Sequence, residues 1–317
     1  MNLVKRYGDL DAVDDVSFTV MGGEVFAFLG PNGAGKSTTI NMLCTLARPT
    51  SGGARVAGYD VTTQARSVRR RIGLVFQEQT LDEQLTAQEN LRFHAVLYGV
   101  PAVEADERIT RVLDLVALGA RRHDLVSTFS GGMARRLEIA RGMLHTPAVL
   151  FLDEPTIGLD PQTRALMWDD VIRMRDEEGV TIFLTTHYMD EAEHADRIAI
   201  IDHGQIIALD TPSRLKAMVG MDTVAMETAD DGAALAALSR LGYRVEATDP
   251  GVIVFVDDAD LAVSRLVDEV GVPVRTVRAH QPTLDDVFLH FTGREIREDR
   301  AEGLVPAMVR AHGVRRR

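Results

Sequence analysis

Eight residues near the start of the chain, Gly30 to Ser37, read GPNGAGKS and have the composition of a phosphate-binding loop. Glycine lets the backbone curl until successive N–H groups point at one anion, and a helix expected from Lys36 adds its N-terminal dipole. In this pattern Lys36 reaches the β- and γ-phosphates, and Ser37 is a ligand for Mg²⁺. We expect a nucleoside triphosphate to bind Gly30, Pro31, Asn32, Gly33, Ala34, Gly35, Lys36, Ser37 and Thr38.

Two carboxylates, Asp153 and Glu154, directly follow the apolar run AVLFL. Taken alone, two acids after a strand are equally compatible with a solvated turn or a helix N-terminus. Together with a phosphate loop they predict hydrolysis, in which Asp153 holds Mg²⁺ and Glu154 polarises the attacking water.

These residues need a scaffold that brings strand ends together, and the sequence predicts one. Short apolar runs alternate with amphipathic stretches up to about Gly220, which favours a mostly parallel sheet covered by helices. The expected strands are GEVFAFLG, RIGLVF, AVLFLD, VTIFLTT and RIAIID. Between Gln77 and Leu125 the spacing is helical, so we expect a helical subdomain over about 77–145 within an α/β domain of residues 1–220.

The pattern changes after Gly220. The order strand, helix, hairpin, helix, strand predicts a small ferredoxin-like α+β domain over 221–292, with the hairpin turning at Asp249-Pro250-Gly251. We expect a further helix starting at Pro282-Thr283, and a basic C-terminal tail over 293–317.

The composition excludes several classes of protein. A formal net charge of −12 does not suit a dedicated nucleic-acid binder. Cys44 is the only cysteine, so no intrachain disulfide can form. No run reaches the roughly 18 apolar residues of a membrane span, and the N-terminus lacks the apolar core of a signal peptide. These features predict a cytosolic protein.

Further residues lie in a fixed order around the two motifs. They are Tyr7 in VKRYG, Gln77 after GLVF, Ser130, Gly131 and Gly132 in FSGGMARRLEIARGML, Asp160 in GLD, and His187 in LTTHYMDEAE. The whole set resembles the ordered motifs of ATP-binding cassette (ABC) proteins, that is, a P-loop NTPase fold. The resemblance implies that the nucleotide is ATP.

In this family two nucleotide-binding domains dimerise head to tail with two ATP molecules between them. The resemblance therefore implies a homodimer, in which Ser130 and the N–H groups of Gly131 and Gly132 cap the γ-phosphate held by the other subunit. Such capping is physically reasonable because these residues open a helix.

The resemblance also assigns roles to the remaining residues. Gln77 would reach Mg²⁺, His187 would bind the γ-phosphate and the attacking water, Asp160 would belong to the D-loop, and Tyr7 would stack on adenine. Together with Lys36 and Glu154, His187 and Gln77 would form the catalytic set. Four of these residues also have a structural alternative. Gln77 is also compatible with a solvated loop residue and His187 with a histidine at a strand end. Asp160 is also compatible with a helix cap and Tyr7 with a packed tyrosine.

Two features depart from the family pattern. Phe129 and Met133 stand where the commonest signature has Leu and Gln, and methionine cannot make the hydrogen bonds of an amide. Family members usually begin with several more residues that form an edge strand before VKRYG. We expect either a shortened strand or a start that lies upstream.

The last third of the chain resembles one branch of the family. QPTLDDVFLHFTGREIRE after a small α/β appendage is similar to the daunorubicin-resistance type of ATP-binding subunit. The resemblance implies export of drugs or other hydrophobic compounds through a separate ABC-2 type membrane subunit, with this chain peripheral on the cytoplasmic face. Leu81, Leu85 and Leu91 are candidates to line the groove that accepts a short helix of this subunit, and for each the alternative is a place in the core of the helical subdomain.

The alternative is an ABC ATPase that acts on nucleic acid or ribosomes. The chain has one set of motifs, no CxxC pair and no sustained heptads, and these features favour the exporter. We therefore expect no nucleic-acid partner.

Overall fold

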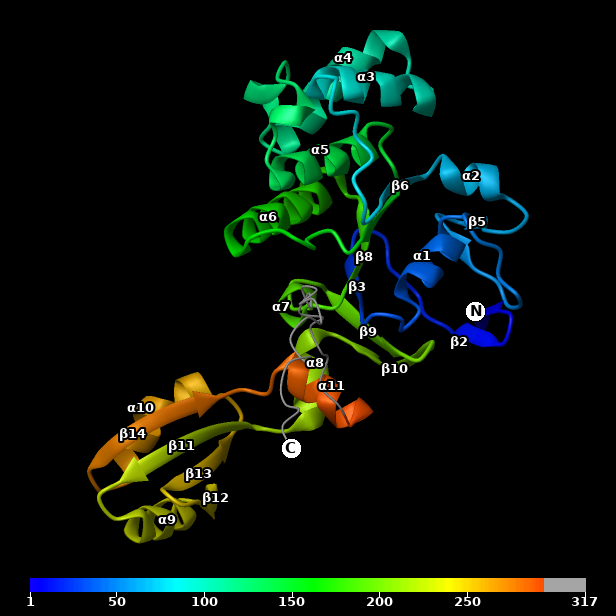
Figure 1. The fold of residues 1–317 in the computed structure, drawn as a ribbon. Helices are drawn as coiled ribbons and strands as arrows, with labels where there is room; N and C mark the ends of the chain where they lie inside the picture. Colours follow the sequence, from blue (N-terminus) through cyan, green and yellow to red (C-terminus); the bar gives the residue numbers. More distant parts are fainter. Residues whose placement is uncertain (294–317) are drawn as a thin grey trace, which may run out of the picture.

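The main part of the molecule is built around a central sheet. The computed structural model describes residues 1–293, which are drawn in colour in Figure 1. Six strands lie in the order β10-β9-β3-β8-β7-β6. Their bounds are β3 (Val25–Leu29), β6 (Ile72–Val75), β7 (Val149–Asp153), β8 (Thr181–Thr186), β9 (Arg197–Asp202) and β10 (Gln205–Asp210). All pairs are parallel except β9 with β10. The predicted α/β class is confirmed.

The sheet has a separate core on each face, because side chains alternate along a strand. Phe26 and Phe28 face one core, which is covered by α1 (Lys36–Leu43), α2 (Ala65–Arg69) and four short strands. These strands are β1 (Leu3–Tyr7), β2 (Leu10–Val16), β4 (Arg55–Val56) and β5 (Tyr59–Asp60). Val25 and Leu29 face the other core, which is covered by α5 (Gly131–Met143), α6 (Pro161–Glu178) and α7 (Met189–Ala192). α1 and α5 therefore lie on opposite faces.

A helical region is inserted between β6 and β7. α3 (Ala87–Tyr98) and α4 (Ala102–Leu115) lie at one end of the molecule, at the top in Figure 1, next to α5. Leu91 of α3 and Ile109 of α4 are fully buried and belong to the same core as α5. Within the predicted helical subdomain α4 ends at Leu115, and Ala117, two residues later, has a positive φ of 48° that a helix cannot contain.

Residues after α8 (Pro212–Val219) form a second sheet with its own core. The elements are β11 (Asp222–Thr228), α9 (Asp231–Arg240), β12 (Arg244–Ala247), β13 (Val252–Val256), α10 (Ala259–Glu269) and β14 (Val274–His280). The strand order is β12-β13-β11-β14, and every pair is antiparallel. Figure 1 shows this unit projecting away from the main sheet.

The last helix corrects the predicted domain boundary. The sequence predicts that α11 (Leu284–Thr292) belongs to the small domain over 221–292. In the structure α11 packs on α8 and α7. Leu284, Val287 and Phe288 are buried in the core of α5 and α6. The chain leaves the main part after α8 and returns to it with α11, so the small unit ends at β14. The predicted tail over 293–317 lies, apart from Gly293, outside the described residues.

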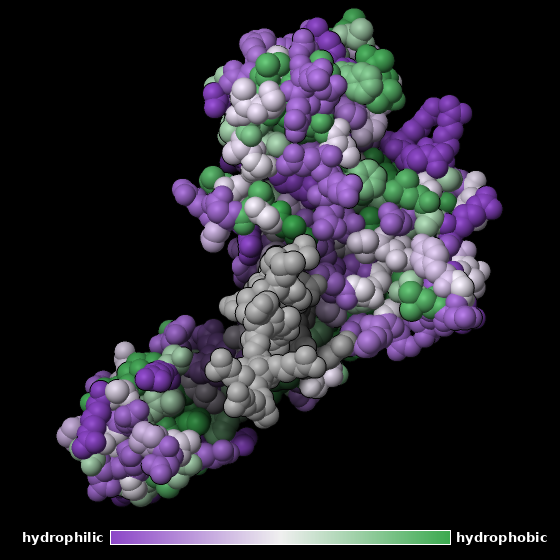
Figure 2. All heavy atoms as spheres, viewed as in Figure 1, coloured by the Kyte–Doolittle hydropathy of each residue, from purple (hydrophilic) through white to green (hydrophobic). Residues whose placement is uncertain are grey.

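The surface of the described residues offers two further observations. None of their helices combines the length and the hydropathy needed to cross a bilayer. Figure 2 shows hydrophobic residues among hydrophilic ones at the end formed by α3 and α4. Phe93, Val96 and Leu97 of α3 are exposed there, as is Val103 of α4.

Candidate nucleotide site

The predicted phosphate loop connects β3 to α1 at the carboxyl end of a central strand. A Cβ on Gly30 would lie 2.3 Å from the carbonyl oxygen of Ile201. Gly35 has a φ of +105°, and a Cβ there would lie 2.4 Å from the carbonyl oxygen of Ala12. Packing thus requires glycine at both positions, and at Gly35 the backbone conformation requires it as well. The loop forms the tight strand-to-helix turn that phosphate binding needs.

Lys36 is held by the loop in which it lies. Its ammonium donates to the carbonyl oxygens of Gly30 at 2.8 Å and Pro31 at 3.2 Å. The same nitrogen lies 2.9 Å from Oε1 of Glu154, and only 4% of Lys36 is exposed. The phosphate loop and the two predicted carboxylates are therefore in direct contact.

Asp153 lies beside the hydroxyl groups of two neighbouring elements. Ser37 donates to its Oδ1 at 3.2 Å, and Thr185 of β8 donates to the same atom at 2.6 Å. Carboxylate and hydroxyl oxygens of this kind are the ligands that Mg²⁺ prefers. The donor set of Ser37 and Asp153 therefore fits the predicted metal.

Glu154 adopts a strained backbone conformation at the end of β7. Its φ is +45°, which is uncommon for a residue other than glycine. Its backbone N–H donates to Oγ1 of Thr185 at 3.0 Å. Burial raises the pKa of its carboxyl group, but the contacts with His187 and Lys36 outweigh burial and hold that pKa below its ordinary value.

His187 follows β8 and faces the same carboxylate. Its Nδ1 lies 3.5 Å from Oε2 of Glu154, close enough for an ion pair when the imidazole is charged but too far for a hydrogen bond. The imidazole packs on the ring of Tyr188 with 4.1 Å between the ring centroids. Lys36, Glu154 and His187 thus form one continuous cluster at the carboxyl ends of β3, β7 and β8, although their motifs lie far apart in the sequence.

Ser130 and Asp160 cap two adjacent helices away from this cluster. Oγ of Ser130 accepts the N–H of Met133 at 3.3 Å at the start of α5. Oδ1 of Asp160 accepts the N–H of Thr163 at 3.0 Å at the start of α6. α5 and α1 cover opposite faces of the sheet, and among the described residues no hydrogen bond or ion pair joins Ser130 to Lys36 or Glu154.

Gly131 and Gly132 differ in their surroundings. A Cβ on Gly132 would lie 2.1 Å from Cγ2 of Thr163, whereas a Cβ on Gly131 would meet nothing within 4 Å. Gly132 therefore allows the close approach of α5 and α6, and Gly131 lies on the surface at the helix start. Met133 packs on the apolar core of this side.

Gln77 and Tyr7 lie in exposed positions. Gln77 is exposed in the loop after β6. Tyr7 ends β1 with 49% of its surface exposed, and the Lys5 ammonium lies 4.7 Å from its ring centroid. Neither residue touches the cluster around Glu154.

One of the residues expected to line a groove for the membrane subunit has another place. Leu91 is fully buried, so it belongs to the core.

Two residues with a place in this site were missed in the sequence. Thr185 joins Asp153 to the backbone of Glu154, and Glu191 is buried and accepts from Thr156 and from Thr186 at 2.7 Å. The hydroxyl pair that ends the apolar run TIFLTT was a signal for the first. Glu191 lies within the acidic stretch MDEAE, and nothing in this pattern distinguished it from its exposed acidic neighbours.

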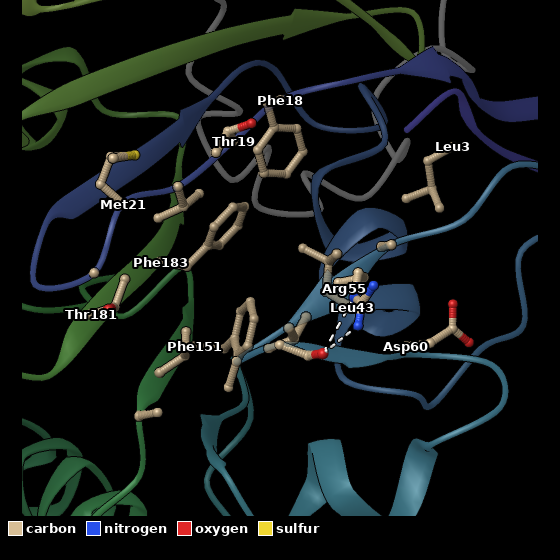
Figure 3. Close-up of a pocket in the computed structure, with 18 of the residues that line it drawn as sticks. Leu3, Phe18, Thr19, Met21, Leu43, Arg55, Asp60, Phe151, Thr181 and Phe183 are labelled. Carbon is tan, nitrogen blue, oxygen red and sulfur yellow. Dashed lines mark hydrogen bonds between the residues drawn. The ribbon is translucent and has the colours of Figure 1, made fainter.

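A large apolar cavity lies elsewhere. Figure 3 shows Phe18, Phe151, Phe183 and Thr181 around a cavity of about 790 Å³. Its lining includes residues at the amino ends of β7 and β8 and none of the phosphate loop. Because ligands of open α/β sheets bind at the carboxyl ends of strands, the cavity is separate from the nucleotide site.

Comparisons with known proteins agree with this geometry. A family model described as ABC transporter matches residues 13–157. The daunorubicin/doxorubicin resistance ATP-binding protein of Streptomyces peucetius is 43% identical over 92% of this chain and 91% of its own length. The linearmycin resistance ATP-binding protein of Bacillus subtilis is 38% identical over 94% of this chain and 98% of its own.

Solved structures resemble the main part of the molecule. The ATP-binding subunit of an ABC transporter is 31% identical with a TM-score of 0.61, over 68% of this chain and 90% of the other. A dimeric ATP-binding cassette in a post-hydrolysis state, bound to ADP and Pi, is 26% identical with a TM-score of 0.60, over 66% of this chain and 96% of the other.

Proposed function

Because the chain belongs to the family of ABC transporter ATP-binding subunits, which bind and hydrolyse ATP, we propose that it powers the export of a drug or another hydrophobic compound. The observation that carries this proposal is the 43% identity, over 92% of the chain, to a daunorubicin/doxorubicin resistance ATP-binding protein. The linearmycin resistance protein supports the same class of function. The alternative, action on nucleic acid or ribosomes, gains no support from these relatives.

The geometry supports a division of roles in hydrolysis. Lys36 binds the terminal phosphates of ATP through its ammonium. Glu154 polarises the attacking water and accepts its proton while the γ-phosphoryl group is transferred to that water. His187, on the other side of the Glu154 carboxylate, orients the water and the γ-phosphate.

The remaining site residues act around this centre. Ser37 and Asp153 would hold Mg²⁺, Gln77 would reach it from the loop after β6, and bound Mg²⁺ would neutralise charge on the phosphates. Ser130 and the N–H groups of Gly131 and Gly132 cap the γ-phosphate of a second copy. Two observations support a homodimer. Ser130 makes no hydrogen bond to Lys36 of its own chain, and one of the similar solved structures is a dimeric ATP-binding cassette. Asp160 and Tyr7 contact the nucleotide.

The proposed membrane partner is a separate ABC-2 type subunit, with this chain on the cytoplasmic face of the membrane. The exposed apolar side chains of α3 are the contact surface that we propose. Phe93, Val96 and Leu97 are 57%, 74% and 64% exposed, and burial of such side chains would favour association. The small unit that ends at β14 is an accessory module of this assembly.

A pull-down of the tagged full chain from its native cell in mild detergent tests the proposal. We expect a polytopic membrane protein in stoichiometric amount, identified by mass spectrometry. Val96→Lys on α3 should reduce its capture, whereas Val103→Lys on α4, at a position 92% exposed, should not. Capture of ribosomes or nucleic acid without a membrane protein would overturn the exporter function and leave the ATP chemistry intact.

A further inference from the structure

Arg135 is a buried arginine on α5 whose guanidinium reaches the segment that carries Glu154. Only 4% of Arg135 is exposed. Its Nε donates to the carbonyl oxygen of Pro155 at 2.8 Å, and its Nη2 donates to that of Asp153 at 3.2 Å. The carbonyl oxygen of Glu154 is 3.5 Å from the same Nη2. One side chain therefore contacts the carbonyls on both sides of Glu154 and that of Glu154 itself.

The conformation of this segment explains why such a contact is needed. A residue with a side chain at a φ of +45° is strained, and it keeps this conformation only where its surroundings determine it. Thr185 holds the N–H of Glu154 from one side. Arg135 holds the carbonyls from the other side, with the planar set of donors that only a guanidinium offers.

The same guanidinium also holds the loop that contains Gln77. Its Nη1 donates to the carbonyl oxygen of Phe76, the residue before Gln77. Glu138, which is fully buried, lies 3.0 Å from this Nη1. Oε1 of Glu138 accepts the N–H of Thr80 at 2.6 Å. The Gln77 loop is thus fixed on both sides, at Phe76 by Arg135 and at Thr80 by its ion-pair partner.

We propose that Arg135 is a positioning residue for ATP hydrolysis, which holds the Glu154 segment and the Gln77 loop in register with the helix that begins at Ser130. This inference rests on the proposed role of Glu154. Because α5 starts at the residue that caps the nucleotide of the second copy, a shift of α5 on dimerisation moves both loops together. Arg135 would act through these backbone contacts and not on the nucleotide directly.

Arg135→Gln in the purified full chain tests the proposal, with Arg136→Gln as its matched control. Arg136 is the next residue of α5 and forms an ion pair with Asp170 at 2.6 Å, away from both loops. For each variant we would measure the ATPase kcat, the Kd of a fluorescent ATP analogue and the Tm.

We expect Arg135→Gln to lower kcat about 100-fold, the effect of a small misplacement of reacting groups. Its Kd should change less than about 3-fold, because Arg135 does not touch the phosphate loop. Arg136→Gln should keep kcat within about 3-fold of the value for the original protein, while it lowers the Tm by about as much as Arg135→Gln does. Equal losses of kcat in the two variants at equal Tm would overturn the proposal, because a purely structural role predicts that result.

If Arg135→Gln does not fold, Arg135→Lys tests the proposal in its place. Lysine keeps the buried charge beside Glu138 but has a single ammonium, which cannot reach both loops. We expect a folded protein with kcat lowered about 10-fold and an unchanged Kd. A kcat equal to that of the original protein would overturn the proposal.

Glu154→Gln in the same assay separates this inference from the proposed function. If Glu154→Gln abolishes turnover and both Arg135 variants remain fully active, only the role of Arg135 is wrong. If Glu154→Gln hydrolyses ATP at the normal rate, the proposed role of Glu154 is wrong, and the role of Arg135 is wrong with it.

Discussion

Lys36 and Glu154 form a buried ion pair in which Nζ and Oε1 are 2.9 Å apart. The two residues are 4% and 7% exposed, so each charge compensates for the burial of the other. A phosphate that approaches Lys36 competes with the carboxylate for the same ammonium. The pair therefore links nucleotide binding to the position of the residue proposed to polarise water.

Glu154→Gln is expected to separate binding from turnover. The amide cannot accept a proton from water, and loss of a general base lowers kcat about 100-fold to 10,000-fold. ATP affinity should be unchanged or higher, because the amide competes less strongly for Lys36. With ATP bound and not hydrolysed, the dimer should accumulate in size-exclusion chromatography. A variant with the normal rate of hydrolysis would exclude Glu154 from this role.

Lys36→Ala is expected to weaken ATP binding. A charge-assisted hydrogen bond contributes about 1.5–3 kcal/mol, so the Kd from a titration should rise about 10-fold to 100-fold. Lys216→Ala is the control, because Lys216 pairs with Glu193 in a surface salt bridge on α8 and should leave the Kd unchanged. An unchanged Kd for Lys36→Ala would contradict the proposed contact with phosphate.

The stability of the protein should depend on pH through Glu154. Burial raises the pKa of this carboxyl, but His187 and Lys36 lower it more, so the folded pKa lies below the ordinary value of 4.5. A lowered pKa means that the folded state favours the ionised form. The resulting stability is complete above the unfolded pKa and is lost as the pH falls through the folded pKa.

Urea unfolding of the original protein and of Glu154→Gln, between about pH 7 and about pH 3, measures this contribution. The free energy of unfolding of the original protein should fall more steeply than that of the variant as the pH drops below about 4.5. Parallel curves would show that the charged form of Glu154 is not favoured by folding.

Ser130→Ala should affect both stability and turnover. Loss of a helix cap costs about 1 kcal/mol. Thr211→Ala is a matched control, because Thr211 caps α8 with the same 3.3 Å contact from its oxygen to a backbone nitrogen. Both variants should lose a similar free energy of unfolding, and only Ser130→Ala should lose ATPase activity and dimerisation. Equal activity in the two variants would limit Ser130 to a capping role.

Local patterns were sufficient to predict much of the site. The alternation of apolar runs and helices indicated the parallel sheet, and strand ends in such a sheet meet at one edge. Glu154 and His187 follow two of these strands, and in the structure Glu154 lies next to both Lys36 and His187. The roles of all the site residues, including these three, stay predictions.

Long-range packing limited what the sequence alone could predict. The pattern of α11 predicted a helix but not which core would bury Phe288, because an apolar face fits any apolar surface of suitable shape. Arg135 in the middle of a charged helix is typical of an exposed residue. It is buried only because carbonyl oxygens from two distant loops converge on its guanidinium.

Two adjacent glycines of α5 provide the last prediction. Gly132→Ala would place a Cβ 2.1 Å from Cγ2 of Thr163, and Thr163 is fixed by two hydrogen bonds to Asp160. The helices α5 and α6 would have to move apart, at a cost of about 1–3 kcal/mol. Gly131→Ala meets nothing within 4 Å and replaces glycine in a helix by alanine, so it should preserve or raise the free energy of unfolding. Thermal unfolding of both variants measures the difference. A Tm for Gly132→Ala as high as that for Gly131→Ala would show that contact between α5 and α6 does not require glycine.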